Sequence, residues 1–199
     1  KIKDLKRIRL SSIEALELTD DFINGVAQLE NFCNHFHIPL QSGSDKILKL
    51  MHRGYETAQF RERIEYIRQH IKDVAITTDV IVGFPGENEK DFADSYNFIK
   101  DIGFSKLHVF PFSQRKGTPA AQLEGKVTKV IKEARSRKLI DLSHNLEMNF
   151  RKKFEGQTMD VLFEERISGE MYEGLTTNYI KVRAKSKDDI HNQIISVKF

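Results

Sequence analysis

Apolar and polar residues alternate along residues 6–154 in two patterns that follow each other several times. Short β-branched or alternating runs predict strands, and apolar residues three and four apart predict helices, two of them capped by Thr19 and Thr57. The predicted strands are residues 6–12, 36–40, 74–82 and 106–112. The predicted helices are residues 19–30, 44–51, 57–71, 89–102 and 126–154. Because parallel strands need crossover helices, we predict an α/β fold whose four strands form an open arc or part of a barrel.

The pattern changes after Gly156. Residues 158–165, 179–184 and 194–199 alternate or are β-branched, and turn-like pairs such as Ser168-Gly169 separate them. This predicts four or five short strands. The chain is therefore divided into an α/β domain, residues 1–155, and a small all-β domain, residues 156–199, which is too small to be stable alone and should pack on the first.

Composition narrows the class of protein. The chain has 199 residues, 39% hydrophobic and 31% charged, which is typical of a globular protein. It shows no run of 18 apolar residues and no apolar stretch after its charged first residues, so we expect no membrane span and no signal peptide. The single cysteine, Cys33, excludes a disulfide framework and a cysteine-held metal or iron–sulfur site within this chain alone, and it favours a reducing, cytoplasmic location.

Charge is concentrated in one segment. Residues 126–153 hold nine lysines and arginines but only three acidic residues, whereas the whole chain has a net charge of +3. Such a block indicates either a surface for a polyanion or the solvated face of a long helix.

Candidate ligand-binding residues lie where the predicted parallel strands end, because ligands bind at the carboxyl ends of such strands. The four loops are residues 11–14, 41–45, 83–87 and 112–118. Gln41 and Ser42 offer amide and hydroxyl groups suited to a ribose or an amino-acid head, and Gly83 allows close backbone approach. Taken alone, the loop after Gln41 could be only a capped turn, and the loop after Gly83 could be only a strand terminator.

Two further features allow structural and functional interpretations. His35 and His37 are spaced to share a strand face and could bind a metal, although ordinary strand-end residues have the same spacing. Asp79 lies inside an apolar strand and needs either a structural hydrogen bond or a ligand. Cys33 is best explained as a packed core residue.

The loops taken together carry a stronger signal. The segments His-Ile-Pro-Leu-Gln-Ser-Gly-Ser-Asp at 37–45, Leu-Met-His-Arg-Gly at 50–54, Thr-Asp-Val-Ile-Val-Gly-Phe-Pro-Gly-Glu at 78–87 and Gly-Thr-Pro-Ala-Ala at 117–121 occur in this order. This combination resembles the methylthiotransferase branch of the radical S-adenosylmethionine enzymes. The segment 108–118 and the segment Asn-Tyr-Ile-Lys-Val at 178–182 most resemble the members that modify N6-threonylcarbamoyladenosine beside the tRNA anticodon.

The resemblance implies a fold and a set of cofactor contacts. The fold would be the C-terminal part of a partial (β/α)6 barrel of parallel strands, followed by a small all-β TRAM domain of the OB-like kind. S-Adenosylmethionine would be bound at the strand ends, through the ribose, methionine and adenine moieties, by Ser12, Gln41, Ser42, Ile81, Val82, Gly83 and Phe110.

The resemblance also implies a reaction and a nucleic-acid partner. The tRNA anticodon stem-loop would be contacted by the basic helix and by Arg53, Lys181, Arg183 and Lys185. Such enzymes insert a methylthio group at C2 of the adenine by radical chemistry, using two 4Fe-4S clusters and an external electron donor. The alternatives are a ribosomal-protein methylthiotransferase of the same family, a non-catalytic RNA-binding module, and an unrelated metal enzyme that uses His35 and His37.

The family's cluster-binding cysteines are absent from this sequence, since it holds only Cys33. We therefore expect the chain to be the C-terminal part of a longer enzyme, inactive alone and without catalytic residues or metal ligands of its own. The first predicted strand, near residues 7–10, would then lack a barrel neighbour, and this exposed edge predicts a dimer.

Overall fold

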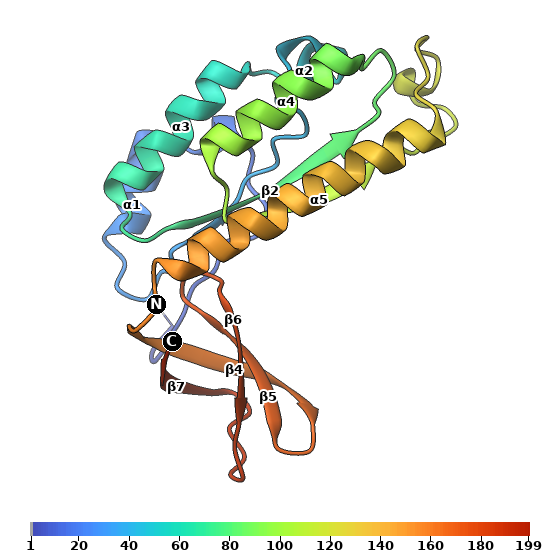
Figure 1. The fold of residues 1–199 in the computed structure, drawn as a ribbon. Helices are drawn as coiled ribbons and strands as arrows, with labels where there is room; N and C mark the ends of the chain where they lie inside the picture. Colours follow the sequence, from blue (N-terminus) through green and yellow to red (C-terminus); the bar gives the residue numbers. More distant parts are fainter. Residues whose placement is uncertain (1) are drawn as a thin grey trace.

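The structure is a computed structural model and describes residues 2–199. Figure 1 shows an α/β unit with helices stacked along a sheet, and a second sheet that extends from one end of it. The helices and strands are, in chain order, α1 Asp20–Ala27, β1 His35–His37, α2 Asp45–Leu50, α3 Thr57–His70, β2 Ala75–Val82, α4 Glu89–Ile102, β3 Lys106–Pro111, α5 Lys129–Lys152, β4 Thr158–Ser168, β5 Met171–Thr176, β6 Lys181–Lys185 and β7 Gln193–Lys198.

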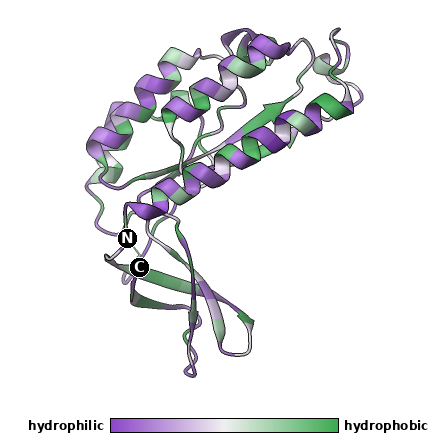
Figure 2. Ribbon diagram, in the orientation of Figure 1, coloured by the Kyte–Doolittle hydropathy of each residue, from purple (hydrophilic) through white to green (hydrophobic). Residues whose placement is uncertain are grey.

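The first sheet is parallel, in the order β1-β2-β3. The prediction of an α/β fold with a parallel sheet is therefore confirmed. Side chains alternate across β2, so Ile76, Val80 and Val82 enter the main hydrophobic core, which α3, α4 and α5 complete. Figure 2 shows the hydrophobic colour along β2, whereas the helices carry hydrophilic positions as well. The opposite face of the sheet carries Thr77, Asp79 and Ile81.

The predicted first strand, residues 6–12, is wrong as a regular strand. Ile8 forms an isolated parallel bridge with Phe32, and Ser12 forms another with His37. Because the two bridges involve residues four apart, Ile8 and Ser12, they do not form a continuous ladder of strand pairing. The residues between them have no strand partner within residues 2–199. The sheet thus has three strands rather than four, and the dimer expected at this edge stays a prediction.

The strand predicted at 36–40 stops early for a local reason. Pro39 has no N–H to donate, and the backbone N–H of Leu40 donates instead to the Thr78 hydroxyl, at 2.9 Å. The chain then rejoins β2, since Gln41 forms an isolated parallel bridge with Val80. The residues after β1 therefore stay beside β2 up to its carboxyl end.

Helix boundaries agree in part with the expected caps. Thr19 caps α1, because its hydroxyl accepts the N–H of Phe22 at 3.2 Å. The N-cap of α3 is Glu56 rather than Thr57, and the Glu56 N–H donates to the Gln59 side chain at 2.9 Å. The long basic helix α5 begins at Lys129, since Thr128 provides its cap.

The second sheet is antiparallel, with the order β6-β5-β4-β7. It has its own hydrophobic cluster around Val161, Phe163 and Tyr172. Gly174 lies where a Cβ atom would come within 2.3 Å of the Leu162 carbonyl oxygen, so the β4–β5 pair requires glycine there. Whether residues 1–155 and 156–199 are independent domains stays a prediction.

The two sheets are joined by polar contacts from several segments. Arg7 donates to the carbonyl of Leu175 at 2.9 Å, and Arg151 of α5 donates to the carbonyl of Lys181 at 3.0 Å. The turn between β5 and β6 reaches the parallel sheet, where the rings of Tyr179 and His35 stack with centroids 4.1 Å apart. The antiparallel sheet therefore packs on the end of the parallel sheet at which β2 begins.

Candidate functional site

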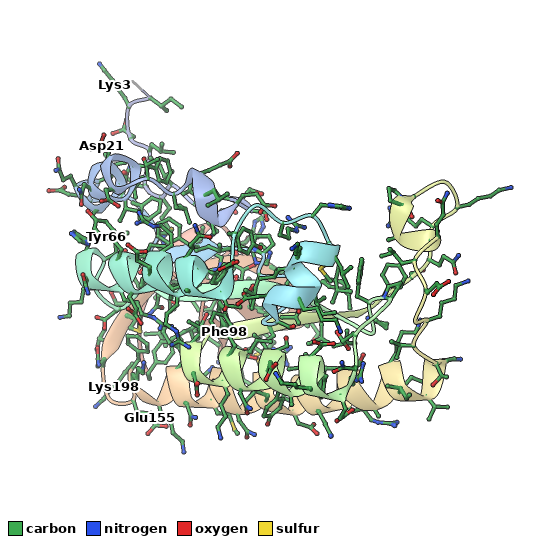
Figure 3. All side chains as sticks on the ribbon, turned by 90° about the horizontal axis from the view of Figure 1, so that it is seen from above. Lys3, Asp21, Tyr66, Phe98, Glu155 and Lys198 are labelled. Atoms are coloured by element: carbon green, nitrogen blue, oxygen red, sulfur yellow. The ribbon has the colours of Figure 1, made fainter. Side chains whose placement is uncertain are left out.

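A cleft of about 500 Å³ lies at the carboxyl ends of the parallel strands. Its walls come from the strand ends and from the loop that follows β3, which Figure 3 shows in yellow, standing out beyond the helix ends. The residues that line it are Gln41, Asp79, Ile81, Phe110, Pro111, Phe112, Ser113, Arg115, Thr118 and Ala120. The cleft lies where a ligand is expected in a parallel α/β fold.

Both backbone polar groups of Gln41 form hydrogen bonds with the backbone of β2. Its N–H donates to the carbonyl of Asp79 at 2.9 Å, and its carbonyl accepts the N–H of Ile81 at 2.8 Å. Its φ is 66°, in the left-handed region that favours glycine. Strain of this kind, held by surrounding hydrogen bonds, is common at binding sites and sets the direction of the Gln41 side chain.

Ile81 and Phe110 form an apolar shelf in the cleft. They are register partners on β2 and β3, so their side chains stand on the same face. Phe110 is 50% exposed, although aromatic side chains are usually covered. An exposed apolar surface beside polar groups suits a flat aromatic ligand such as a purine base.

Asp79 supplies the one carboxylate among the residues that line this cleft. It lies two residues before Ile81 on β2, on the same face of the sheet. Its Oδ1 is 3.2 Å from Nε2 of His37. Its side chain is 27% exposed, so the group has both a protein partner and access to the cleft. From the sequence, Asp79 could serve either a structural hydrogen bond or a ligand, and it is not among the predicted site residues.

The structure does not bring four of the predicted contact residues to the cleft. Ser42 is 1% exposed, and its hydroxyl accepts the N–H of Ser44 at 3.2 Å. Val82 points into the core, and Gly83 lies against the side chain of Lys132. Ser12 is exposed beside His37 and does not line the cleft. Gln41, Ile81 and Phe110 are brought together, and the ligand contacts of all seven residues stay predictions.

The loop after β2 is fixed by a buried ion pair. Oε1 of Glu87 accepts the N–H of Gly83 at 2.9 Å and Nη1 of Arg135 at 2.6 Å. Both side chains are almost fully buried. Arg135 is one of the nine basic residues that indicated a polyanion surface, but its charge is used inside the protein to hold the end of β2 against α5.

The residues predicted to bind RNA are partly engaged by acids. Arg53 binds Glu14 at 2.9 Å. Lys181 and Arg183 both bind Glu173, which lies on the neighbouring strand β5. Lys185 is exposed. The alternation of basic residues along β6 is thus correct, but the sequence alone did not reveal the acid opposite two of them.

The metal interpretation of His35 and His37 finds no support within residues 2–199, where no group of three or more histidine, cysteine or acidic side chains is placed to hold a metal ion. Both rings bond instead to the Thr77 hydroxyl, at 3.0 Å from Nε2 of His35 and 2.9 Å from Nδ1 of His37. Burial, and then the charge of Arg9, lower the pKa of His35 to about 3.

Comparison with known families and proteins agrees with this geometry. The model of the Radical SAM superfamily matches residues 2–99. The chain is 42% identical, over its whole length, to the threonylcarbamoyladenosine tRNA methylthiotransferase MtaB of Bacillus subtilis.

Residues 2–99 therefore belong to the radical SAM superfamily. The resemblance to its methylthiotransferase branch is confirmed by a second relative. The tRNA-2-methylthio-N(6)-dimethylallyladenosine synthase of Aquifex aeolicus is 42% identical over 89% of this chain. The chain spans 45% of the Bacillus protein and 40% of the Aquifex protein, less than half of either.

Solved structures show the same fold at low sequence identity. The coproporphyrinogen III oxidase HemN of Escherichia coli, a radical SAM enzyme, has a TM-score of 0.60 at 13% identity and covers 86% of this chain and 46% of its own. The Elp3 protein of Methanocaldococcus infernus has a TM-score of 0.53 at 12% identity, covering 85% of this chain and 52% of its own. Within residues 2–199, none of the helices is long and apolar enough to cross a membrane.

Proposed function

We propose that this chain is the adenosyl-binding and RNA-binding part of a tRNA methylthiotransferase that acts on N6-threonylcarbamoyladenosine beside the anticodon. The observation that carries the proposal is the cleft where Gln41, Ile81 and Phe110 meet. The identity of 42% with a relative named for that nucleoside supports the choice of substrate. Both relatives are named as tRNA-modifying enzymes, which favours this substrate over a ribosomal protein.

Superfamily membership implies S-adenosylmethionine and a 4Fe-4S cluster. The cleft fits S-adenosylmethionine in size and chemistry, since its volume of about 500 Å³ is within the usual range for small-ligand sites. The adenine would lie on the shelf of Ile81 and Phe110. Gln41 and Asp79 would accept hydrogen bonds from the ribose or the amino group, and Arg115, Ser113 and Thr118 would face the polar tail.

The residues of this chain do not fit a 4Fe-4S cluster. Such clusters need several cysteine thiolates, whereas this chain has one cysteine, Cys33, which is 1% exposed. We therefore assign no electron-transfer step to these residues and propose that the two clusters and their electron donor act from outside this chain. The residues present bind and orient the adenosyl group and exclude water.

We further propose that the antiparallel sheet is a TRAM-like RNA-binding module. Exposed basic side chains of β6 and the basic outer face of α5 are the groups that would meet phosphates. The stretch Asn178–Val182, which resembles the threonylcarbamoyladenosine members, forms the turn into β6 and lies against the parallel sheet.

The test is binding by the 199-residue chain itself. S-Adenosylmethionine should bind, and the Phe110→Ala variant should bind at least tenfold more weakly because the shelf is lost. The Ile140→Ala variant, which removes an exposed apolar residue from α5, is the matched control. Absence of S-adenosylmethionine binding to the wild-type chain would refute the adenosyl-site proposal.

Substrate choice is tested with RNA. An anticodon stem-loop carrying N6-threonylcarbamoyladenosine should bind more tightly than the same stem-loop with plain or dimethylallyl adenosine, and binding should weaken steeply with salt. Equal affinity for the three RNAs would contradict the choice of nucleoside. RNA binding without any S-adenosylmethionine binding would favour the non-catalytic RNA-binding module.

A further inference from the structure

A row of polar side chains runs along the sheet face that the helices leave uncovered. Nε2 of His35 lies 3.0 Å from Oγ1 of Thr77, which lies 2.9 Å from Nδ1 of His37. Nε2 of His37 lies 3.2 Å from Oδ1 of Asp79. These four side chains alternate between β1 and β2 and end at the carboxylate that lines the cleft.

The chemistry of the two ends fixes the direction of these hydrogen bonds. The Asp79 carboxylate can only accept, so Nε2 of His37 donates to it. At the other end, Nδ1 of His35 is buried and has no partner among the described residues. A buried N–H without an acceptor is more costly than a bare lone pair, so the His35 proton is on Nε2 and donates to Thr77. The Thr77 hydroxyl then donates to Nδ1 of His37, at 2.9 Å, in preference to the carbonyl of Phe36, which lies 3.5 Å away.

Burial and neighbouring charges disfavour the protonated forms of two histidines on this face, His35 and His108. His35 is buried, and its pKa is lowered to about 3, first by that burial and then by Arg9, so the ring is neutral near pH 7. His108 faces His37 and Asp79 from β3, and burial lowers its pKa as well. Lys106 of β3 and Glu147 of α5 also act on His108, and Arg115 lines the cleft together with Asp79. Further charged side chains of α5, β4, β5 and β6 line the space beside Thr77 and His108, namely Arg151, Glu164, Glu165, Glu173, Lys181 and Arg183.

The far end of the row is held by the antiparallel sheet. The ring of Tyr179 stacks on that of His35 with an interplanar angle of 12°, and the guanidinium of Arg9 lies 4.7 Å from the Tyr179 ring centroid. Tyr179 has a φ of 66°, unusual for a bulky residue. Its neighbour Asn178 is 2% exposed and donates to the carbonyl of Asp73 at 3.4 Å. The left-handed backbone of Tyr179 and the buried Asn178 beside it hold the ring against His35, although the Tyr179 residue is 38% exposed.

We propose that Thr77 and His37 are positioning residues that fix the Asp79 carboxylate in the adenosyl cleft, and that Tyr179 anchors them from the antiparallel sheet. This inference rests on the proposed S-adenosylmethionine site. It assigns a role to the Tyr179 turn other than direct RNA contact, because the turn supports the cleft from its far side.

The first experiment does not depend on the proposed function. The ¹⁵N chemical shifts of the imidazoles report which nitrogen carries the proton, and they are measured on the ¹⁵N-labelled chain near pH 7. We expect the Nε2–H form for both His35 and His37, and we expect the Thr77→Val variant to change the Nδ1 shift of His37. A His37 ring without a proton on Nε2 would overturn the proposal, because it could not donate to Asp79.

The second experiment measures S-adenosylmethionine affinity by calorimetry. Thr77→Val should weaken binding about tenfold, which corresponds to about 1.4 kcal/mol, and Thr77→Ser should restore it because the hydroxyl returns. Tyr179→Ala should weaken binding severalfold, and Tyr179→Phe should not. Ser143→Ala is the control, since Ser143 is a buried hydroxyl on α5 that accepts the N–H of Leu107 at 2.9 Å, on the other face of the sheet.

The outcomes separate the two proposals. A wild-type chain that fails to bind S-adenosylmethionine refutes the proposed function, whatever the tautomers are. A wild-type chain that binds, with unchanged affinity in Thr77→Val, refutes the positioning role alone. If Thr77→Val does not fold, His37→Ala replaces it, because it removes the donor to Asp79, and it is expected to show the same loss of affinity.

Discussion

Acid should destabilise this protein through His35. Its pKa is lowered in the folded state from 6.5 to about 3, because burial and then the charge of Arg9 disfavour the protonated ring. A second proton would have to be placed on Nδ1, which is buried without a partner among residues 2–199. Because the folded pKa is lower than the unfolded one, the stabilising contribution is fully present above pH 6.5 and is lost as the pH falls from 6.5 towards 3.

The size of the effect follows from the same two values. Between pH 7.5 and pH 5 the unfolded histidine takes up its proton and the folded one does not, which removes about 2 kcal/mol from the free energy of unfolding. Urea unfolding followed by circular dichroism at the two pH values measures this loss. The His35→Gln variant has no titrating ring and can still donate to Thr77, so its stability should fall by about 2 kcal/mol less over the same interval.

The comparison of the two proteins isolates His35 from the other titrating groups. Equal losses of stability for the wild type and His35→Gln between pH 7.5 and pH 5 would refute the reasoning, because the cost would then arise elsewhere.

Three other predictions address the loop after β2, the contact between the Gln41 loop and α4, and the exposed end of β6. Arg135→Ala should lower the free energy of unfolding by about 3–5 kcal/mol, because it leaves the buried Glu87 carboxylate unpaired. Removing the exposed Lys90 should leave that free energy nearly unchanged, and urea unfolding measures both. Gly43→Ala should weaken S-adenosylmethionine binding in calorimetry, since the new Cβ would lie 2.8 Å from the α4 backbone and displace the loop that holds Gln41; unchanged affinity would contradict this. Lys185→Ala should reduce the log–log salt slope of stem-loop binding by about one unit in fluorescence titrations, and an unchanged slope would remove this residue from the RNA surface.

The sequence predicted elements whose signals are local. The β-branched run at 74–82 became β2, and the helix predicted at 89–102 has the same bounds in the structure, where Asn88 caps it and Gly103 ends it in the left-handed region. The strand predicted at 6–12 failed because its pairing depends on distant partners, which it meets at only two residues. Periodicity shows which residues could form a strand, but not whether a neighbour is there to pair with them.

The candidate site was predictable only as a location. Strand ends placed Gln41, Ile81 and Phe110 at one edge, but the inward turn of Ser42 follows from its hydrogen bond with Ser44. The partnership of Asp79 with His37 depends on the side-by-side placement of β1 and β2. The contact between Asp79 and His37 joins residues far apart in sequence, and no spacing rule within one chain reveals it.

We propose that the cleft at the carboxyl ends of the parallel strands binds an adenosyl group. The most direct measurement is the titration of S-adenosylmethionine into the chain with ¹³C-labelled isoleucine methyls and phenylalanine rings, followed by NMR. We expect saturable shifts of the Ile81 and Phe110 signals and none at Ile195 or Phe163 in the antiparallel sheet. Unchanged Ile81 and Phe110 signals at millimolar S-adenosylmethionine, or shifts confined to the antiparallel sheet, would contradict it.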